Sequence, residues 1–326
     1  MAGSGSTTGS APAVLVEGLR KAYGPVRAVD GVDLSIAHGE VVALLGPNGA
    51  GKTTTVETLE GYRRRDAGRV EVLGVDPEHG GRAFRERIGV VLQEAGFEEQ
   101  FSVLELVRLH AGYYPHPRPV DQVIDVAGLA EKRGARVKTL SGGQRRRLDL
   151  ALGIIGDPEL LFLDEPTTGF DPAARRKAWD LVDRLRDLGT TILLTTHYMD
   201  EAEHLADRLV VIDRGRVVAE GTAEELAARG GARTVVSFRL PATLVDDGLP
   251  PLAGTVHSAG ASTEVLTPDP TRDLHTLTGW AIERGIRLDD LSLTRPGLEE
   301  IYLELIGDTP TGEPLPAGVG AEGDDA

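Results

Sequence analysis

Nine consecutive residues carry the clearest chemical signal in the sequence. They contain two glycines five positions apart, followed by a lysine and a threonine. Backbone N–H groups in such a loop can surround a phosphate, because glycine has no Cβ atom to block the approach. The lysine can reach the outer phosphates of a nucleotide, and the threonine hydroxyl can ligate Mg²⁺. The predicted phosphate-binding residues are Gly46, Pro47, Asn48, Gly49, Ala50, Gly51, Lys52, Thr53 and Thr54.

The residues around this loop predict the elements that would hold it. Residues 41–45 are apolar and partly β-branched, which favours a buried strand. Residues 53–59 contain neither glycine nor proline and can open a helix. A glycine loop between a strand and a helix N-terminus forms a phosphate cradle, whereas the same letters in another context are a chance glycine-rich turn. The context here favours the cradle.

Two adjacent acids follow a second apolar run. Residues 160–163 read Leu-Leu-Phe-Leu, and Asp164 and Glu165 come directly after them. At the end of a buried strand the two carboxylates can divide the work of hydrolysis. Asp164 can hold Mg²⁺ through water while Glu165 acts as the general base on the attacking water. The alternative is a capping Asp-Glu pair on a surface turn, which the apolar run disfavours.

A second anion-binding pattern lies in residues 140–144, Leu-Ser-Gly-Gly-Gln. Ser141 can cap a helix that runs through Leu148, Leu150 and Leu152. Its hydroxyl and the glycine N–H groups would then meet an anion at the positive end of the helix dipole. Ser-Gly-Gly is also a common turn, so this pattern carries weight only together with the others.

Six motifs in one order make residues 13–228 resemble the nucleotide-binding domain of ABC transporters. They are residues 46–54, Gln93, residues 140–144, residues 160–165, residues 169–171 and His197. The resemblance implies that two ATP molecules, with Mg²⁺, are sandwiched in a head-to-tail homodimer or a dimer with a paralogous subunit. It also implies ATP hydrolysis with Lys52 and Glu165 at the catalytic centre.

Further site residues follow from the same resemblance, position by position. Tyr23 resembles the aromatic residue that stacks on adenine, although it also fits an ordinary turn tyrosine. Gln93 resembles the glutamine that contacts the metal and the attacking water, and His197 the histidine that holds the γ-phosphate. Asp171 resembles the residue that crosses the dimer interface; Phe170 replaces the family's usual leucine, which we expect to alter packing only. The residues expected to reach the opposite subunit's nucleotide are Ser141, Gly142, Gly143 and Gln144.

The subfamily resembled is that of bacterial drug-exporter ATPases of the daunorubicin-resistance type. The resemblance lies in one nucleotide domain followed by an α+β extension, and in residues 195–203 and 296–302. It implies a motor subunit that drives efflux of a drug or antibiotic-like compound through a separate transmembrane permease. The subunit would be cytoplasmic and peripheral on the inner face of the membrane. We interpret the extension as a packing or dimer-stabilising module, with a regulatory sensor as the alternative.

The expected fold is α/β, a P-loop NTPase of ABC type. It comprises a mainly parallel sheet with helices on both faces, an antiparallel β subdomain and an inserted helical subdomain, followed by a small α+β domain. The expected divisions are a disordered leader at 1–12, the nucleotide domain at 13–229 with its helical subdomain at about 94–139, the accessory domain at 231–308 and a disordered acidic tail at 309–326.

Composition limits the alternatives. The 326 residues include no cysteine, which excludes disulfides and thiolate chemistry, and no apolar run approaches the length of a membrane span. A net charge of −16 disfavours nonspecific binding to nucleic acid, so we expect no nucleic-acid partner. An ABC ATPase acting on ribosomes or DNA, an importer or lipid-export ATPase, and a non-hydrolysing regulator remain as alternatives. Intact Lys52, Glu165 and His197 oppose the last of these.

Overall fold

The computed structural model describes residues 11–91, 96, 98–229, 234–240, 248–260, 262–294, 298 and 302. Several predictions lie outside these residues. They concern the metal and water contact of Gln93, almost all of the leader, the acidic tail and parts of the accessory domain, among them residues 299–301 and 303–308.

A six-stranded sheet forms the centre of the nucleotide-binding part. Five of its strands are parallel, and the sixth closes an antiparallel hairpin at one edge, which confirms the mainly parallel sheet. The order is β5 (Ile88–Val91), β6 (Leu160–Asp164), β7 (Thr191–Thr196), β3 (Val41–Leu45), β8 (Arg208–Asp213) and β9 (Arg216–Gly221). Because β3, β6 and β7 are parallel neighbours, the residues that follow them emerge at one edge of the sheet.

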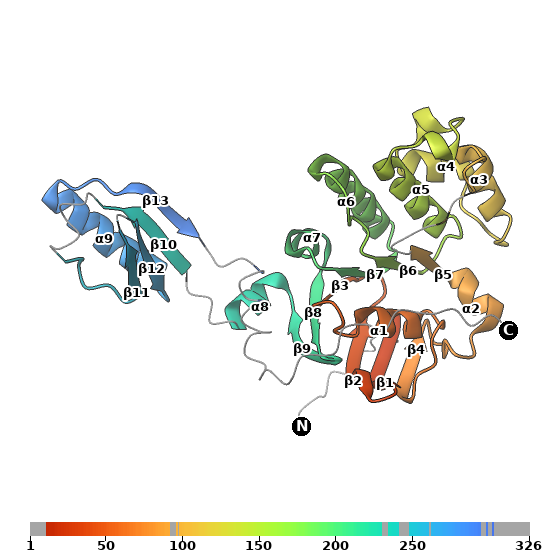
Figure 1. The fold of residues 1–326 in the computed structure, drawn as a ribbon, viewed down its shortest axis with the longest axis horizontal. Coiled ribbons are helices and arrows are strands. Elements are labelled where there is room, and N and C mark those ends of the chain that lie inside the picture. The colour runs from red at the N-terminus through yellow and green to blue at the C-terminus, as the bar shows by residue number, and fades with distance from the viewer. Residues whose placement is uncertain are drawn as a thin grey trace, which may run out of the picture.

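Both faces of this sheet are buried, which explains why its strands are continuously apolar. In β3, Val41, Ala43 and Leu45 belong to one core cluster, and Val42 and Leu44 belong to another. The first cluster packs against helices that include α5 (Gly142–Ile154), α6 (Pro172–Asp187) and α7 (Met199–Leu205). The second cluster packs against helix α1 (Lys52–Leu59) and a separate small sheet (Figure 1).

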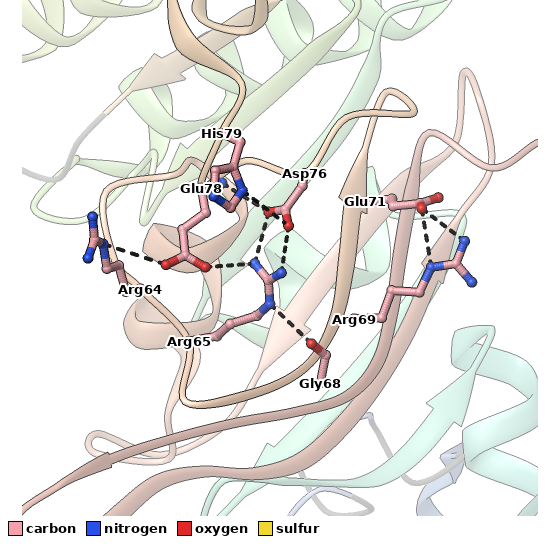
Figure 2. A network of polar contacts seen from close by, with 8 residues as sticks. All are labelled: Arg64, Arg65, Gly68, Arg69, Glu71, Asp76, Glu78 and His79. Atoms are coloured by element: carbon pink, nitrogen blue, oxygen red, sulfur yellow. Dashed lines mark hydrogen bonds and ion pairs between the residues drawn. The ribbon is translucent and has the colours of Figure 1, made fainter.

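The small sheet is antiparallel, as predicted, with the order β2 (Val26–Ile36), β1 (Val14–Tyr23) and β4 (Ala67–Val72). Arg65 fixes the chain between α1 and this sheet. Its guanidinium donates two hydrogen bonds to Asp76, at 2.9 and 2.6 Å, and one to Glu78 at 3.1 Å (Figure 2). This pairing holds the pKa of Asp76 down at about 2. The short helix α2 (Gly81–Arg87) follows and leads into β5.

Helices α3 (Val103–Ala111) and α4 (Val120–Val126) pack with α5 at one end of the molecule (Figure 1). A capping box between Ser102 and Glu105 begins α3. The buried face of α3 is Val103, Leu106, Val107 and Ala111, whereas Leu109 is 41% exposed. Two short 3-10 turns, η1 (Ala130–Lys132) and η2 (Val137–Thr139), lead to α5.

The C-terminal part has a sheet and a core of its own. Helix α8 (Ala223–Arg229) precedes it, and β11 (Thr255–Ala259), β12 (Ser262–Thr267), β10 (Thr234–Arg239) and β13 (Asp289–Thr294) form an antiparallel sheet in that order. Helix α9 (Pro270–Arg284) packs on β10. The sheet and helix confirm an α+β unit. In the described residues, no helix is long and apolar enough to cross a membrane.

Candidate nucleotide-binding site

The loop after β3 is held so closely by neighbouring backbone that two of its glycines are obligatory. A Cβ atom on Gly46 would lie 2.2 Å from the carbonyl oxygen of Ile212. One on Gly51, whose φ is +104°, would lie 2.2 Å from the carbonyl oxygen of Ala28. The β8–β9 hairpin also donates a hydrogen bond from the Gly215 N–H to the loop at 2.8 Å. Neighbouring backbone therefore fixes the shape of the loop.

Lys52 lies at the first position of α1 and folds back over the loop. Its ammonium donates to the carbonyl oxygens of Gly46, at 2.7 Å, and Pro47, at 3.1 Å. Burial lowers the pKa of Lys52, and the nearby carboxylates of Glu165 and Asp164 act in the opposite direction. A partly desolvated cation beside the loop is suited to neutralise phosphate charge.

Asp164 and Glu165 sit beside this loop because β6 pairs in parallel with β7. The register places Asp164 opposite Thr195, whose hydroxyl donates a hydrogen bond to the Asp164 carboxylate. The backbone N–H of Glu165 donates to the carbonyl and hydroxyl oxygens of Thr195, each at 3.1 Å. Thr195 therefore orients both acids from the neighbouring strand.

Glu165 has an unusual backbone conformation. Its φ of +45° is rare for a residue with a side chain, and such strain concentrates at functional sites. Its carboxylate accepts a hydrogen bond from the Thr168 hydroxyl at 3.0 Å. The other oxygen lies 3.3 Å from Nδ1 of His197, which follows β7. A carboxylate aimed in this way can accept a proton from a positioned water molecule.

Lys52, Asp164, Glu165 and His197 line one cavity of about 790 Å³. Tyr23 is at its rim, with the charged groups of Lys21 and Arg63 each 5.6 Å from the centre of its ring. An exposed aromatic ring beside two cations suits a nucleotide base with attached phosphates. The lining residues are Tyr23, Ala28, Gly46, Pro47, Asn48, Gly49, Gly51, Lys52, Thr53, Thr54, Asp164, Glu165, His197 and Tyr302.

The second predicted anion site lies in another cavity, of about 810 Å³. Ser141 begins α5 through a capping box: its hydroxyl oxygen accepts from the Gln144 N–H, and the Gln144 side chain accepts from the Ser141 N–H. Asp171 caps α6 by accepting from the Ala174 N–H at 2.8 Å. The predicted residues that line this cavity are Ser141, Gly142, Gly143 and Asp171.

Two predicted ligand contacts have side chains turned to other uses. Ala50 is a buried residue of the loop, and the side chain of Gln144 is engaged in the helix cap. Neither is among the described lining residues of the two cavities. Their contacts with a nucleotide stay predictions.

Arg146 joins the two predicted motifs and was missed in the sequence. From α5 it donates to the carbonyl oxygens of Asp164 at 2.8 Å, Glu165 at 3.2 Å and Pro166 at 3.0 Å. It also donates to the carboxylate of Asp149 at 2.8 Å. Burial raises the pKa of Asp149 to about 6, and Arg146 opposes that rise. Arg146 thus ties the start of α5 to the turn at 164–166.

Two further residues of the site were also missed. Thr195 could have been suspected, because a polar residue near the end of a buried strand faces the next parallel strand end. Tyr302 lies far along the chain in a stretch whose only signal was the weak resemblance of residues 296–302. No local pattern places it beside the loop at 46–54.

Comparisons with known proteins agree with this geometry. Residues 29–168 match the ABC transporter family, and residues 234–297 match an ABC transporter domain-containing protein-like C-terminal domain. A daunorubicin resistance ATP-binding protein, DrrA3 of Streptomyces coeruleorubidus, is 44% identical over 91% of this chain and 96% of its own. Nod factor export ATP-binding protein I of Ralstonia nicotianae is 42% identical over 93% of this chain and 96% of its own.

Solved structures give the same result. An ATP-binding subunit of an ABC transporter, 25% identical, covers 67% of this chain and 93% of its own with a TM-score of 0.60. The cbiO1 protein of Clostridium perfringens, part of an ABC transporter complex, is 30% identical, with coverages of 67% and 92% and a TM-score of 0.61. With a P-loop NTPase fold and relatives matched over nine tenths of its length, the chain belongs to the ABC transporter family as an ATP-binding, ATP-hydrolysing subunit.

Proposed function

We propose that this subunit is the motor of an exporter and works as a head-to-tail dimer. The observation that carries the proposal is the separation of the two phosphate-type sites. The loop at 46–54 and the start of α5 line different cavities, and no described residue lines both. A single copy therefore offers two half-sites. A second copy turned head to tail would bring each half-site to the complementary half on its partner.

In each composite site, one protomer would supply most of the contacts to ATP. Tyr23 would stack on the adenine, and the backbone of residues 46–54 with Lys52 would enclose the phosphates. The second protomer would close the site with Ser141 and Gly143 at the helix N-terminus, and Asp171 would cross the interface nearby. The Ser141 oxygen accepts a hydrogen bond within the cap, so its own hydrogen can still be donated to a γ-phosphate.

The residues beside the loop also fit Mg²⁺. Thr53 and Asp164 line the same cavity, and both offer hard oxygen ligands, the type that Mg²⁺ prefers. Mg²⁺ usually takes its remaining ligands from water and substrate phosphates, so two protein oxygens are enough. When bound, Mg²⁺ would neutralise charge on the phosphates; Gln93 is proposed as a further contact.

Hydrolysis would then depend on Glu165. Its carboxylate accepts the proton of a water molecule as the water oxygen attacks the γ-phosphorus and the bond to the ADP oxygen breaks. Thr168 and Thr195 hold the acid in place, through its carboxylate and its backbone. His197, 3.3 Å from the same carboxylate, would hold the γ-phosphate. General base catalysis of this kind contributes about 10²- to 10⁴-fold to the rate.

We further propose that dimer closure drives a separate transmembrane permease, which would place the subunit on the inner face of the cell membrane. Relatives similar over most of their length are named for daunorubicin resistance and for Nod factor export. Export is stated in the second name, and efflux of the drug would account for the resistance in the first. We favour a drug or antibiotic-like compound. We also propose the domain division 13–229 and 231–308, with the helical subdomain at about 94–139.

The test is the Glu165→Gln substitution, with the exposed Glu131→Gln as matched control. We expect Glu165→Gln to bind ATP, to hydrolyse it at least about a hundredfold more slowly and to double its apparent mass from 34.7 kDa when ATP is added. Cells that carry the variant with the permease should accumulate more daunorubicin than cells with Glu131→Gln. Near-normal hydrolysis would refute the general-base role. Equal drug accumulation would refute drug export.

A further inference from the structure

The chain returns to the nucleotide-binding part after it has completed the C-terminal sheet. Strand β13 ends at Thr294, and Leu298, four residues later, is 3% exposed within the core cluster formed by the helices and the six-stranded sheet. The N–H of Leu298 donates to the Glu203 carboxylate of α7 at 3.2 Å. Leu298 is therefore an anchor of the returning chain on the nucleotide-binding part.

Tyr302 follows this anchor and reaches the site itself. It packs against the same core cluster and lines the 790 Å³ cavity with the loop at 46–54 and His197. Burial raises the pKa of Tyr302 to about 12, and the neighbouring Asp213 carboxylate adds to the rise. Like that of any tyrosine, the hydroxyl is protonated at neutral pH, and here it is a hydrogen-bond donor inside the cavity that contains the phosphate loop.

The end of β8 supports the loop that shares this cavity with Tyr302. The carbonyl oxygen of Ile212 approaches Gly46 closely, and the hairpin after Asp213 holds the loop through the Gly215 N–H. Tyr302 lines the cavity together with this supported loop, where the acceptors of a bound nucleotide are its phosphate and ribose oxygens.

We propose that Tyr302 is a nucleotide-contacting residue of its own protomer and that Leu298 and Tyr302 link nucleotide occupancy to the C-terminal sheet. The short connection from the end of β13 to Leu298 couples the positions of the C-terminal sheet and the nucleotide-binding part. Four residues span at most about 14 Å when fully extended, so β13 cannot move far without pulling on Leu298. This inference rests on the nucleotide site proposed above and adds a residue that lies outside the six motifs.

The experiment measures ATP and AMP affinities of the full chain by equilibrium dialysis for wild type, Tyr302→Phe and Leu298→Ala. Tyr113→Phe, an exposed tyrosine at the end of α3, is the matched control, and Lys52→Ala shows that the assay reports on the site. Phenylalanine keeps the packing of Tyr302 and removes only its donor. We expect ATP binding to weaken about three- to tenfold in Tyr302→Phe and to be unchanged in Tyr113→Phe.

Comparison of the two nucleotides distinguishes the acceptors. Equal weakening for AMP places the contact at the ribose or α-phosphate, and weakening for ATP alone places it at the outer phosphates. Leu298→Ala, which touches no nucleotide, should weaken ATP binding while thermal melting shows a folded chain. ATP should also slow amide hydrogen exchange in β10 and β13 of wild type, and this slowing should be lost in Leu298→Ala.

The outcomes separate the two proposals. If wild type binds ATP and Lys52→Ala does not, but Tyr302→Phe binds like wild type, Tyr302 is only a packing residue and the inference is wrong. If ATP leaves exchange in the C-terminal sheet unchanged, the link to that sheet is refuted. If wild type itself fails to bind ATP, the proposed nucleotide site fails first.

Discussion

Replacing Arg146 by alanine should lower both the stability of the nucleotide-binding part and its rate of ATP hydrolysis. The substitution removes the ion pair to Asp149 and the hydrogen bonds to the carbonyl oxygens of Asp164, Glu165 and Pro166. Removing one partner of a buried ion pair costs about 3–5 kcal/mol. Burial already raises the pKa of Asp149 to about 6, and without Arg146 this acid can take up a proton. We therefore expect the lower end, a loss of about 3 kcal/mol in the free energy of unfolding.

The loss of Arg146 should also slow ATP hydrolysis, independently of the loss of stability. The carbonyl oxygens that Arg146 holds belong to the turn that aims Glu165, and a displacement of about 1 Å can cost about a hundredfold in rate. The variant Arg146→Leu with Asp149→Leu replaces the pair by apolar side chains, which is often neutral or stabilising. We expect this double variant to regain most of the stability but to hydrolyse ATP about ten- to a hundredfold more slowly than wild type.

Urea unfolding followed by Trp179 fluorescence, in a Trp280→Phe background, measures the stability of the nucleotide-binding part. Steady-state turnover of ATP measures catalysis. Arg147→Ala is the matched control, because this neighbour on α5 donates to the carbonyl oxygens of Ala127 and Gly128 instead. It should keep near-normal turnover. A double variant that regains both stability and turnover would refute the positioning role of Arg146.

Two other predictions test the loop and the helix that follows it. Gly46→Ala should cost about 1–3 kcal/mol of stability and weaken ATP binding at least about tenfold, because the added Cβ would meet the Ile212 carbonyl oxygen. Isothermal titration measures the binding. The control is Gly134→Ala, whose added Cβ would have nothing within 4 Å. Burial raises the pKa of Glu60 from 4.5 to about 8, so the folded chain keeps a proton that the unfolded chain releases. Wild-type stability should therefore fall between about pH 4.5 and 8. Glu60→Gln escapes this loss. Its advantage in the free energy of unfolding, measured with urea, should grow by up to about 1.4 kcal/mol per pH unit; a constant difference across that range would contradict the assignment.

The fold followed from local patterns wherever one residue type dominates an element. Buried parallel strands are continuously apolar, and β3 and β6 were predicted to within one residue at their ends. The starts of α6 and α9 are set by Asp171-Pro172 and Asp269-Pro270, which act as N-cap and first helical residue.

The site was predictable on its phosphate side and less so elsewhere. The glycine spacing predicts the phosphate loop and the acids after an apolar run predict Glu165, because phosphate binding and hydrolysis require those residue types close together in sequence. The contacts of Arg146 and Tyr302 join segments far apart in the chain, and neither residue belongs to a pattern that demands it. Such residues become visible only when the sheet order brings their partners together.

The most direct test of the account mixes two inactive variants. One carries Lys52→Ala and the other Gly143→Asp, both in the Glu165→Gln background, so that bound ATP is retained through gel filtration. In a head-to-tail dimer, the mixed pair combines both defects in one composite site and leaves the other intact. We predict that neither variant alone retains ATP and that the mixture retains about one ATP per heterodimer. A mixture that retains none would contradict a site shared between two copies.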